Sequence, residues 1–285
     1  MSTLVPVMIR TFGRTGSTLL MQILGTSDRV CFEKVYPFEQ RYLTYVHNMA
    51  RMVSLTAKSD AVWNNDTMFM GKSQRIGPLP YSKIDSLNKE KLSQSCFKAL
   101  WKEFSISMRE QQQVPSTGRA YYAEKVPHYV AQAANEHLQG MNIFLLRDPR
   151  DEMVSIKRFN EKRGFNSFGW QEEDSDLSYA TKMCKTHHQF LKNLVSFKSD
   201  KRRTYVRYED LVRNGESEVA RLSEWLGTEM SISKAQSDKA VRKKHMTSSS
   251  ANSSVERWKS ELSDEVLNVF SRELGTELDS LGYTV

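Results

Sequence analysis

The sequence has no apolar run long enough to cross a membrane, and this shortage limits what the protein can be. None of its hydrophobic stretches approaches the roughly 20 residues that a bilayer-spanning helix requires. The opening MSTLVPVMIRTFGR also lacks the basic, then apolar, then small-residue order of a secretory signal. We therefore expect a cytoplasmic protein without a transmembrane segment.

Cysteine is equally scarce, with only Cys31, Cys96 and Cys184 in 285 residues. An odd number at wide spacing argues against a disulfide framework, and the lack of a CxxC motif or a Cys/His cluster argues against a zinc site. We expect buried thiols and no metal centre.

Basic residues are in excess but are not concentrated. Lys and Arg number 41 against 34 Asp and Glu, a formal net charge of +7, which favours an anionic ligand. The densest clusters, KSDKRR (198–203) and RKKH (242–245), are short and lack the interleaved aromatic residues of a single-strand binding platform. Nucleic acid is therefore not the expected partner.

Apolar runs alternate with amphipathic segments, which is typical of an α/β fold with a central parallel sheet flanked by helices. About five strands are predicted, at residues 5–11, 29–38, 120–126, 141–146 and 203–208. Helices are predicted at residues 17–25, from Pro127, from Pro149, and at 175–198, 216–227 and 264–281.

Two stretches depart from this alternation. Residues 40–118 are methionine-rich and amphipathic, with a break at RIGPLP and helical spacing over 85–113, so we interpret them as a helical insertion. The Ser- and Asn-rich residues 240–258 predict a mobile surface segment. No repeat or linker divides the chain, and we expect a single domain over 1–285.

GRTGST, which begins at Gly13, joins the first predicted strand to the first helix and has the features of an anion-binding turn. Such a turn directs unpaired backbone N–H groups and the positive end of a helix dipole at one point. Gly13 and Gly16 leave the backbone open to a ligand, and Arg14 adds a charge. Ser17 and Thr18 add hydroxyl donors. The alternative is a tight turn in which Ser17 caps the helix.

The turn differs from the P-loop of ATP-binding proteins, GxxxxGK[ST], because the second glycine and its lysine are missing. FLLRD also places an arginine ahead of Asp148, unlike a strand that ends in a magnesium-binding aspartate. The turn is therefore predicted to hold a phosphate that needs no metal. An ATP-dependent small-molecule kinase and a non-catalytic nucleotide- or RNA-binding module remain the alternatives.

RTGST resembles the loop that holds the 5′-phosphosulfate in sulfotransferases that use 3′-phosphoadenosine 5′-phosphosulfate (PAPS). It matches all five positions of the family's [RK]-[ST]-G-[ST]-[ST] loop. The resemblance implies a P-loop-like sulfotransferase fold and donor contacts from Arg14, Thr15, Gly16, Ser17 and Thr18.

FLLRDPRDEMVS (144–155) is similar to the family's 3′-phosphate motif. Arg147 follows a predicted strand, where open α/β sheets bind ligands, and a guanidinium suits a dianionic phosphate. An ion pair with Asp151 or Glu152 is the alternative. The role of Ser155 in binding this phosphate is implied by the resemblance alone.

Two further nucleotide contacts are also implied by the resemblance. VRYEDLV (206–212) is similar to the family's segment with a tyrosine near the nucleotide, here Tyr208, whereas Glu209 and Asp210 are expected to cap the following turn. HMTSSSANSSVERW (245–258) resembles a C-terminal loop that covers the adenosine, with Arg257 as the basic residue; a disordered tail is the alternative.

Catalysis of sulfuryl transfer requires cations and a base. Arg14 is one candidate cation. Lys125 in EKVP is the other, because it follows a predicted strand and resembles the family's K-x-P lysine; the alternative is an ordinary surface lysine.

The resemblance favours Glu39 in YPFEQRY as the base. Glu124 is the second candidate. It precedes Lys125 on the same predicted strand, and neighbouring strand residues point to opposite faces, so only one of these two side chains can enter the site. Glu33 and His128 follow. Arg41 either orients Glu39, binds an acidic acceptor or forms a structural salt bridge.

The resemblance thus implies transfer of a sulfuryl group from PAPS to a hydroxyl or amine, with 3′,5′-diphosphoadenosine (PAP) as product and no metal. The lack of a signal and anchor suggests a bacterial or cytosolic member, although the base pattern is similar to Golgi-type relatives. The acceptor is expected to be a small molecule, carbohydrate or lipid. Trp63, Tyr81 and Trp101 in the insertion predict an apolar-walled pocket as readily as a sugar platform, so they do not choose among these classes.

Overall fold

The computed structural model of the protein describes residues 3–35, 37–39, 41–54, 87–115, 117–235, 247–248 and 250–284. The expected break at RIGPLP, Trp63 and Tyr81 lie outside these ranges. The chain forms two compact units. The first contains Met1–Met8, Asp28–Val35 and Glu39–Met141, and the second contains Ile9–Ser27, Tyr36–Phe38 and Asn142–Val285.

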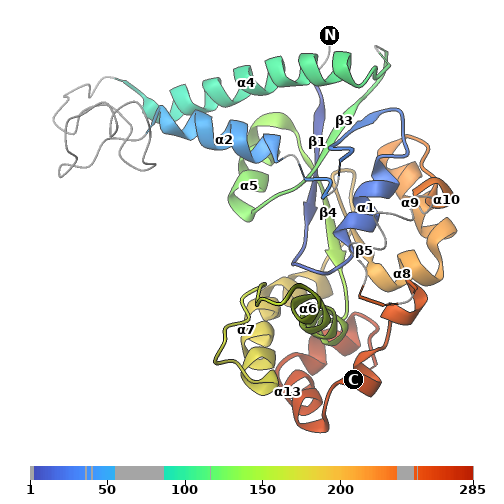
Figure 1. The fold of residues 1–285 in the computed structure, drawn as a ribbon. Helices are drawn as coiled ribbons and strands as arrows, with labels where there is room; N and C mark the ends of the chain where they lie inside the picture. The colour runs from blue at the N-terminus through green and yellow to red at the C-terminus, as the bar shows by residue number, and fades with distance from the viewer. Residues whose placement is uncertain are drawn as a thin grey trace. The chain divides into compact units, whose positions relative to one another are not determined.

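Five strands form the central sheet, as predicted (Figure 1). They are β1 (Val5–Arg10), β2 (Val30–Cys31), β3 (Tyr121–Lys125), β4 (Met141–Leu146) and β5 (Arg203–Arg207). Their order is β2-β3-β1-β4-β5, and the β2–β3 and β4–β5 pairs are parallel. The expected α/β class is therefore confirmed.

The second strand is much shorter than the predicted 29–38. After Cys31 the backbone leaves the ladder, because both polar groups of the Phe32 main chain bind the Gln112 side chain. Phe32 N donates to Gln112 Oε1 at 3.4 Å, and Gln112 Nε2 donates to the Phe32 carbonyl at 2.8 Å. A side-chain amide thus replaces a neighbouring strand.

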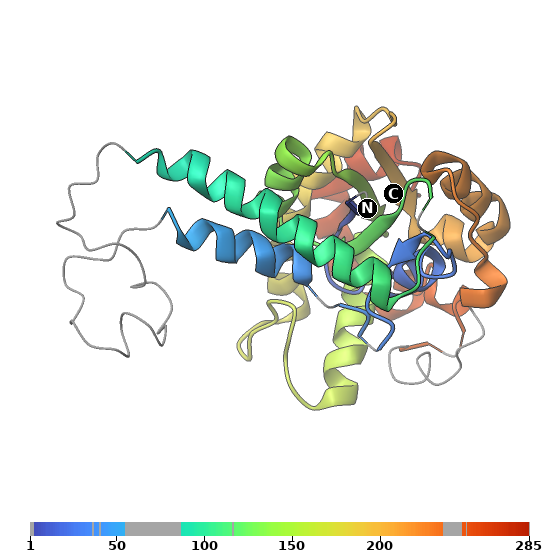
Figure 2. The ribbon, with the colours of Figure 1, turned by 90° about the horizontal axis from the view of Figure 1, so that it is seen from above.

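In the first unit, helices α2 (Tyr42–Met52) and α4 (Lys89–Gln111) lie side by side (Figure 2). Asn88 caps α4 by accepting from Lys91 N at 2.9 Å. Helix α5 (His128–Leu138) begins directly after Pro127, as expected. Trp101 is buried, and its Nε1 donates to the Leu4 carbonyl at 2.9 Å. It is therefore a core residue and not the wall of a pocket.

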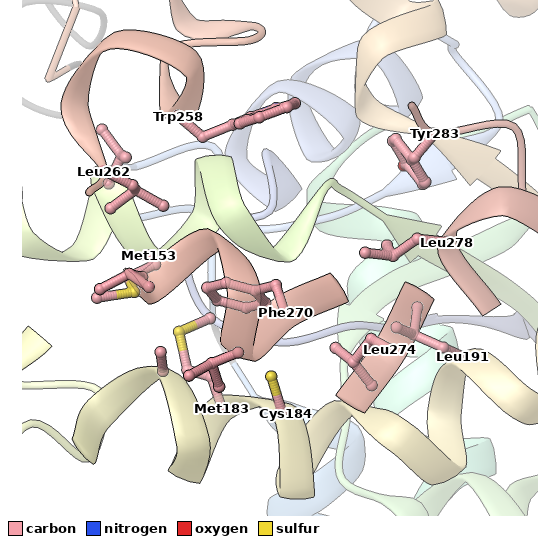
Figure 3. Packing of buried hydrophobic residues seen from close by; sticks show 14 of the residues in the cluster. Met153, Met183, Cys184, Leu191, Trp258, Leu262, Phe270, Leu274, Leu278 and Tyr283 are labelled. Carbon is pink, nitrogen blue, oxygen red and sulfur yellow. The ribbon is translucent and has the colours of Figure 1, made fainter. Parts of the chain in front are cut away.

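In the second unit, α1 (Ser17–Leu24) follows β1 and α6 (Pro149–Arg163) follows β4 (Figure 1). The other α-helices that the structure describes there are α7 (Asp176–Val195), α8 (Tyr208–Arg213), α9 (Gly215–Leu226), α10 (Ile232–Ala235), α12 (Trp258–Glu261) and α13 (Asp264–Ser280). Helices α7 and α13 pack together, with Cys184, Phe270 and Leu274 buried in one apolar cluster (Figure 3).

The C-terminal part of the predicted mobile segment is docked on α6. Asp151 Oδ2 accepts from Glu256 N at 2.6 Å, and its Oδ1 accepts from Trp258 N at 3.1 Å. The Arg150 guanidinium lies 3.8 Å from the Trp258 ring centroid. The alternative of a disordered tail is therefore wrong for this portion, because two backbone donors and an indole have partners on a distant helix.

Helix α8 corrects a second expectation. Glu209 does not cap the turn after Tyr208 but is buried within the helix. It accepts from Asp148 N and from the Tyr283 hydroxyl, both at 2.9 Å.

Among the described helices, none combines the length and apolar character needed to cross a membrane.

Candidate functional site

The loop from Thr11 to Gly16 turns sharply between β1 and α1. Arg14 and Gly16 both have left-handed backbones, with φ of 63° and 93°. Alternation of this kind creates anion-binding concavities in turns. Gly16 is the N-cap residue of α1 and Ser17 is its first helical residue, so the alternative in which Ser17 caps the helix is wrong.

Glycine is required at Gly16 for two reasons. Its φ is unfavourable for other residues, and a Cβ there would overlap the Tyr208 ring. A Cβ at Gly13 would likewise overlap the Phe168 ring. Aromatic rings therefore pack directly on the backbone of the loop.

Thr15 stabilises the loop internally. Its hydroxyl lies 2.5 Å from that of Thr11 and 3.2 Å from the Phe12 carbonyl, and the Thr11 hydroxyl donates to the Leu145 carbonyl at 2.8 Å. The Thr15 side chain is thus engaged inside the loop. Its contribution to a ligand would come from the backbone.

Arg14 packs against α6 through two residues one turn apart. Its Nε donates to Ser155 Oγ at 3.3 Å, and its guanidinium lies 4.2 Å from the Phe159 ring centroid. Arg14 and Ser155 are both buried. The spacing of four residues places Ser155 and Phe159 on the same face of α6.

Arg147 connects the loop to the C-terminal segment. Its two terminal nitrogens donate to the carbonyls of Arg14 at 2.8 Å and Ser254 at 2.7 Å. The guanidinium lies 4.7 Å from the Tyr208 ring centroid, and the Tyr208 hydroxyl is 2.8 Å from Ser254 Oγ. Arg147 Nε is buried without a hydrogen-bond partner in the described chain.

The alternative of an ion pair between Arg147 and a nearby carboxylate does not describe this arrangement. Burial raises the pKa of Asp151, and the charge of Arg147 acts against burial to lower it. The hydrogen bonds of the Asp151 carboxylate, however, come from the backbone of the C-terminal segment. Glu152 lies 3.1 Å from His187 Nε2.

Arg257 reaches the same neighbourhood through Thr247. Its Nε donates to Glu261 Oε1 at 2.8 Å, and a terminal nitrogen donates to the Thr247 carbonyl at 3.2 Å. The Thr247 hydroxyl is in turn 3.5 Å from Ser155 Oγ. The structure thus brings together Arg14, Ser155, Arg147, Tyr208 and, one residue removed, Arg257.

Ser254 and Thr247 were missed by the sequence reasoning. Both lie in the stretch that its Ser and Asn content marked as a surface segment. The signal that could have found them is Trp258, because an indole beside a Ser-rich stretch indicates docking rather than disorder.

The catalytic candidates of the first unit differ in their surroundings. Glu39 Oε2 pairs with Arg41 at 2.8 Å, with the side chains 23% and 68% exposed respectively. Glu33 accepts from Val35 N at 2.8 Å in a local turn. Lys125 is half-buried at the end of β3, and His128 is exposed at the start of α5.

Glu124, by contrast, is 2% exposed and holds the start of α2. Its Oε2 accepts from Leu43 N at 2.8 Å and from the Tyr122 hydroxyl at 3.0 Å. Its Oε1 accepts from Thr44 N at 3.1 Å and from the Thr44 hydroxyl at 2.7 Å. Burial raises the pKa of Glu124, although these hydrogen bonds act in the opposite direction.

Within the described residues, no group of three or more His, Cys, Asp or Glu side chains gathers where it could hold a metal ion.

Comparison with known proteins adds a family assignment. A family model described as the sulfotransferase family matches residues 6–231. No curated protein sequence matches the chain significantly.

Many solved structures match the fold. The sulfotransferase domain from the curacin biosynthetic pathway is 16% identical, with a TM-score of 0.50 and 100% of each chain covered. The sulfotransferase domain of the Synechococcus PCC 7002 olefin synthase is 15% identical, with a TM-score of 0.48 and coverage of 100% of this chain and 97% of that one. A mouse sulfotransferase complexed with PAP is 12% identical, with a TM-score of 0.44 and coverage of 98% and 89%.

Because the family model extends over most of the 285 residues and includes the loop, β4 and α6, the chain belongs to the sulfotransferase family.

Proposed function

We propose that this sulfotransferase takes its sulfuryl group from PAPS and passes it to a hydroxyl or amine of a small-molecule, carbohydrate or lipid acceptor. The observation that carries the proposal is the meeting of the two expected phosphate motifs. Ser155 lies against Arg14 from 141 residues away in the sequence, and Arg147 reaches the Arg14 carbonyl from 133 residues away.

The cluster suits a bisphosphorylated nucleotide in two respects. The left-handed Gly16, where only glycine fits beside Tyr208, is the N-cap of α1, and a helix N-terminus favours an anion. Arg147 Nε is a buried donor without a partner in the described part of the chain, and leaving such a group unpaired costs about 1–3 kcal/mol. An anionic oxygen bound there would recover this cost.

We assign the 5′-phosphosulfate to the loop residues Arg14 to Thr18, where backbone N–H groups and the start of α1 favour an anion. Arg147 and Ser155 would hold the 3′-phosphate, with Arg257 reaching toward it. Tyr208 would support the site by packing on Gly16 and Arg147.

For the chemical step, Arg14 and Lys125 would neutralise the charge that develops on the departing phosphate. Glu39 is the favoured base, because Glu124 is already engaged by four donors and Glu33 by a local backbone N–H. Arg41 would hold the Glu39 carboxylate through its ion pair.

Titration calorimetry with PAP and with AMP tests the donor assignment. The wild-type protein should prefer PAP. Arg147→Ala should weaken PAP binding by roughly 10- to 100-fold, because a charge-assisted hydrogen bond is lost, and should affect AMP much less. Arg158→Ala is a matched control, since Arg158 is an exposed arginine on α6, the helix that follows Arg147. A wild-type protein without preference for PAP over AMP would overturn the proposal.

A screen of acceptors with sulfur-labelled PAPS then tests turnover. Transfer of the label to an acceptor is the expected result. Binding of PAP without transfer to any hydroxyl or amine would instead leave a nucleotide-binding module.

A further inference from the structure

Phe12, the residue before Gly13, packs on a buried ion pair that the proposed reaction does not use. Its ring centroid lies 3.9 Å from that of His187 on α7. His187 Nε2 lies 3.1 Å from Glu152 Oε2 of α6, and the two side chains are 5% and 3% exposed. The loop therefore rests on a pair of ionisable groups.

The hydrogen-bond geometry fixes where the protons of this pair lie. His187 Nδ1 is 2.8 Å from the Met183 carbonyl, which can only accept, so Nδ1 carries a hydrogen. The contact between Nε2 and Glu152 Oε2 needs a second proton between the two atoms. The pair thus holds one proton that can be lost.

Two opposing effects act on this proton. Burial alone would lower the pKa of His187, but attraction to the Glu152 carboxylate and the hydrogen bonds outweigh it, so the pKa of His187 is raised. Tyr179 on α7 also faces Glu152, and burial followed by the Glu152 charge raises the pKa of this phenol. On the loop side the neighbours are the uncharged rings of Phe12 and Phe190.

Helix α6 reaches the loop at two points. Ser155 contacts Arg14 directly, and Glu152, three residues earlier, acts on Phe12 through His187. Residues spaced by three share a helix face. Both ends of the Phe12–Arg14 segment are therefore supported from one face of α6.

We infer that His187 and Glu152 are positioning residues for the donor-binding loop. While the pair keeps its proton, it holds Phe12 in place and with it the backbone that enters Gly13. Loss of the proton leaves a buried carboxylate facing the lone pair of a neutral imidazole, so the contact breaks and the loop loosens. The inference rests on the proposed function only in that PAP is the ligand used to read out the loop.

The sign of the pH dependence follows from the raised pKa of His187. The support is fully present below the ordinary histidine pKa of about 6.5 and is lost as pH rises through the higher value in the folded protein. PAP affinity should therefore fall over that interval.

Glu152→Gln separates positioning from charge. The amide N–H can donate to Nε2 of a neutral His187, so the contact persists without a proton to lose. PAP affinity measured by calorimetry from roughly pH 6 to pH 9 should thus fall in the wild type but less in this variant. The phosphates of PAP titrate equally with every variant, so each affinity is compared as a ratio to the wild type.

At low pH, where the wild-type pair keeps its proton, His187→Ala should weaken PAP binding by up to about 100-fold, because a displaced binding group is costly even when the displacement is small. This difference should shrink at higher pH, where the wild type loses the same support. His188→Ala is the matched control, since this neighbour on α7 has a side chain that is 47% exposed. Its Nδ1 lies 3.9 Å from Glu277 Oε1. This variant should match the wild type.

Hydrogen exchange of the peptide covering residues 10–20, measured without ligand, provides a readout that is independent of PAP. His187→Ala should speed this exchange, and so should high pH in the wild type relative to Glu152→Gln at the same pH. If the wild type binds no PAP while exchange responds in this way, the proposed function fails and the positioning role stands. Identical pH profiles and loop exchange in the wild type and Glu152→Gln would overturn the inference, and this holds even if His187→Ala does not fold.

Discussion

At the scale of single residues, Arg147 joins segments that are far apart in the sequence. It donates to carbonyls of the anion loop and of the C-terminal segment, and it lies on the Tyr208 ring. A side chain with these contacts supports the site as well as facing the ligand. Substitutions around it should therefore affect stability and donor affinity together.

Gly16→Ala tests the packing of Tyr208 on the loop. Gly164→Ala is the matched control, because both glycines have positive φ but only Gly16 has a ring where the Cβ would go. Backbone strain should lower the free energy of unfolding by about 1–2 kcal/mol in both variants. The clash should cost about 1–3 kcal/mol more at Gly16 and weaken PAP binding. Urea unfolding and calorimetry measure the two effects, and equal losses with unchanged PAP affinity would contradict the packing argument.

Glu39→Gln tests the proposed base. Loss of a general base should lower kcat by about 10²- to 10⁴-fold while leaving the affinity for PAP unchanged. Glu33→Gln, at a carboxylate that accepts from a local N–H, should keep wild-type turnover. Steady-state kinetics with a saturating acceptor measure both, and wild-type rates in Glu39→Gln would move the role to another residue.

Much of the site was predictable at this scale, because the glycine-containing turn and the arginine at a strand end carry local signals. In the structure Arg14 contacts both Ser155 and Arg147. The roles of Ser254 and Thr247 carry no local signal of this kind, since their contacts with Arg147 and Ser155 arise only when the chain folds.

At the scale of elements, the start of helix α2 is capped by a side chain from strand β3. Arg41, its N-cap residue, provides no side-chain hydrogen bond to the helix. Glu124 on β3 instead accepts from the first-turn N–H groups of Leu43 and Thr44. A carboxylate near a helix N-terminus also interacts favourably with the helix dipole.

Glu124→Gln should therefore act on stability. The amide keeps one acceptor oxygen and turns an NH2 group toward N–H donors, so the free energy of unfolding should fall by about 1–3 kcal/mol. Urea unfolding measures this loss, and exposed Glu103 on α4 offers a control substitution. Unchanged stability combined with a collapse of kcat would instead make Glu124 the base.

Strand and helix positions followed from apolar runs and from proline and glycine punctuation, as α5, α6 and α9 illustrate. The length of β2 did not, because the Gln112 side chain takes the hydrogen bonds of Phe32. Caps and ladder ends depend on partners that local pattern cannot specify.

At the scale of the whole molecule, every contact described for the phosphate cluster lies within the second unit. The candidate carboxylates and Lys125 belong to the first unit. The net charge of +7 adds a general attraction for a polyanionic nucleotide, which salt will screen.

PAP should accordingly stabilise the protein against heat. At 100 times its Kd, a ligand that binds only the folded state contributes about 2.7 kcal/mol. Thermal unfolding should show a higher Tm with PAP than with AMP at equal concentration, and EDTA should not change the difference. A larger shift with ATP and magnesium than with PAP would favour the kinase alternative.

The clamped guanidinium of Arg147 has one further consequence. Its rotamers are restricted before any nucleotide binds, so little side-chain entropy is lost on binding. On the proposed function Arg147 would contact the 3′-phosphate, which PAPS and PAP share, so it would hold both nucleotides equally. After sulfuryl transfer, PAP would therefore keep the contacts to both of its phosphates and dissociate slowly. Release of PAP, rather than the chemical step, would then limit kcat.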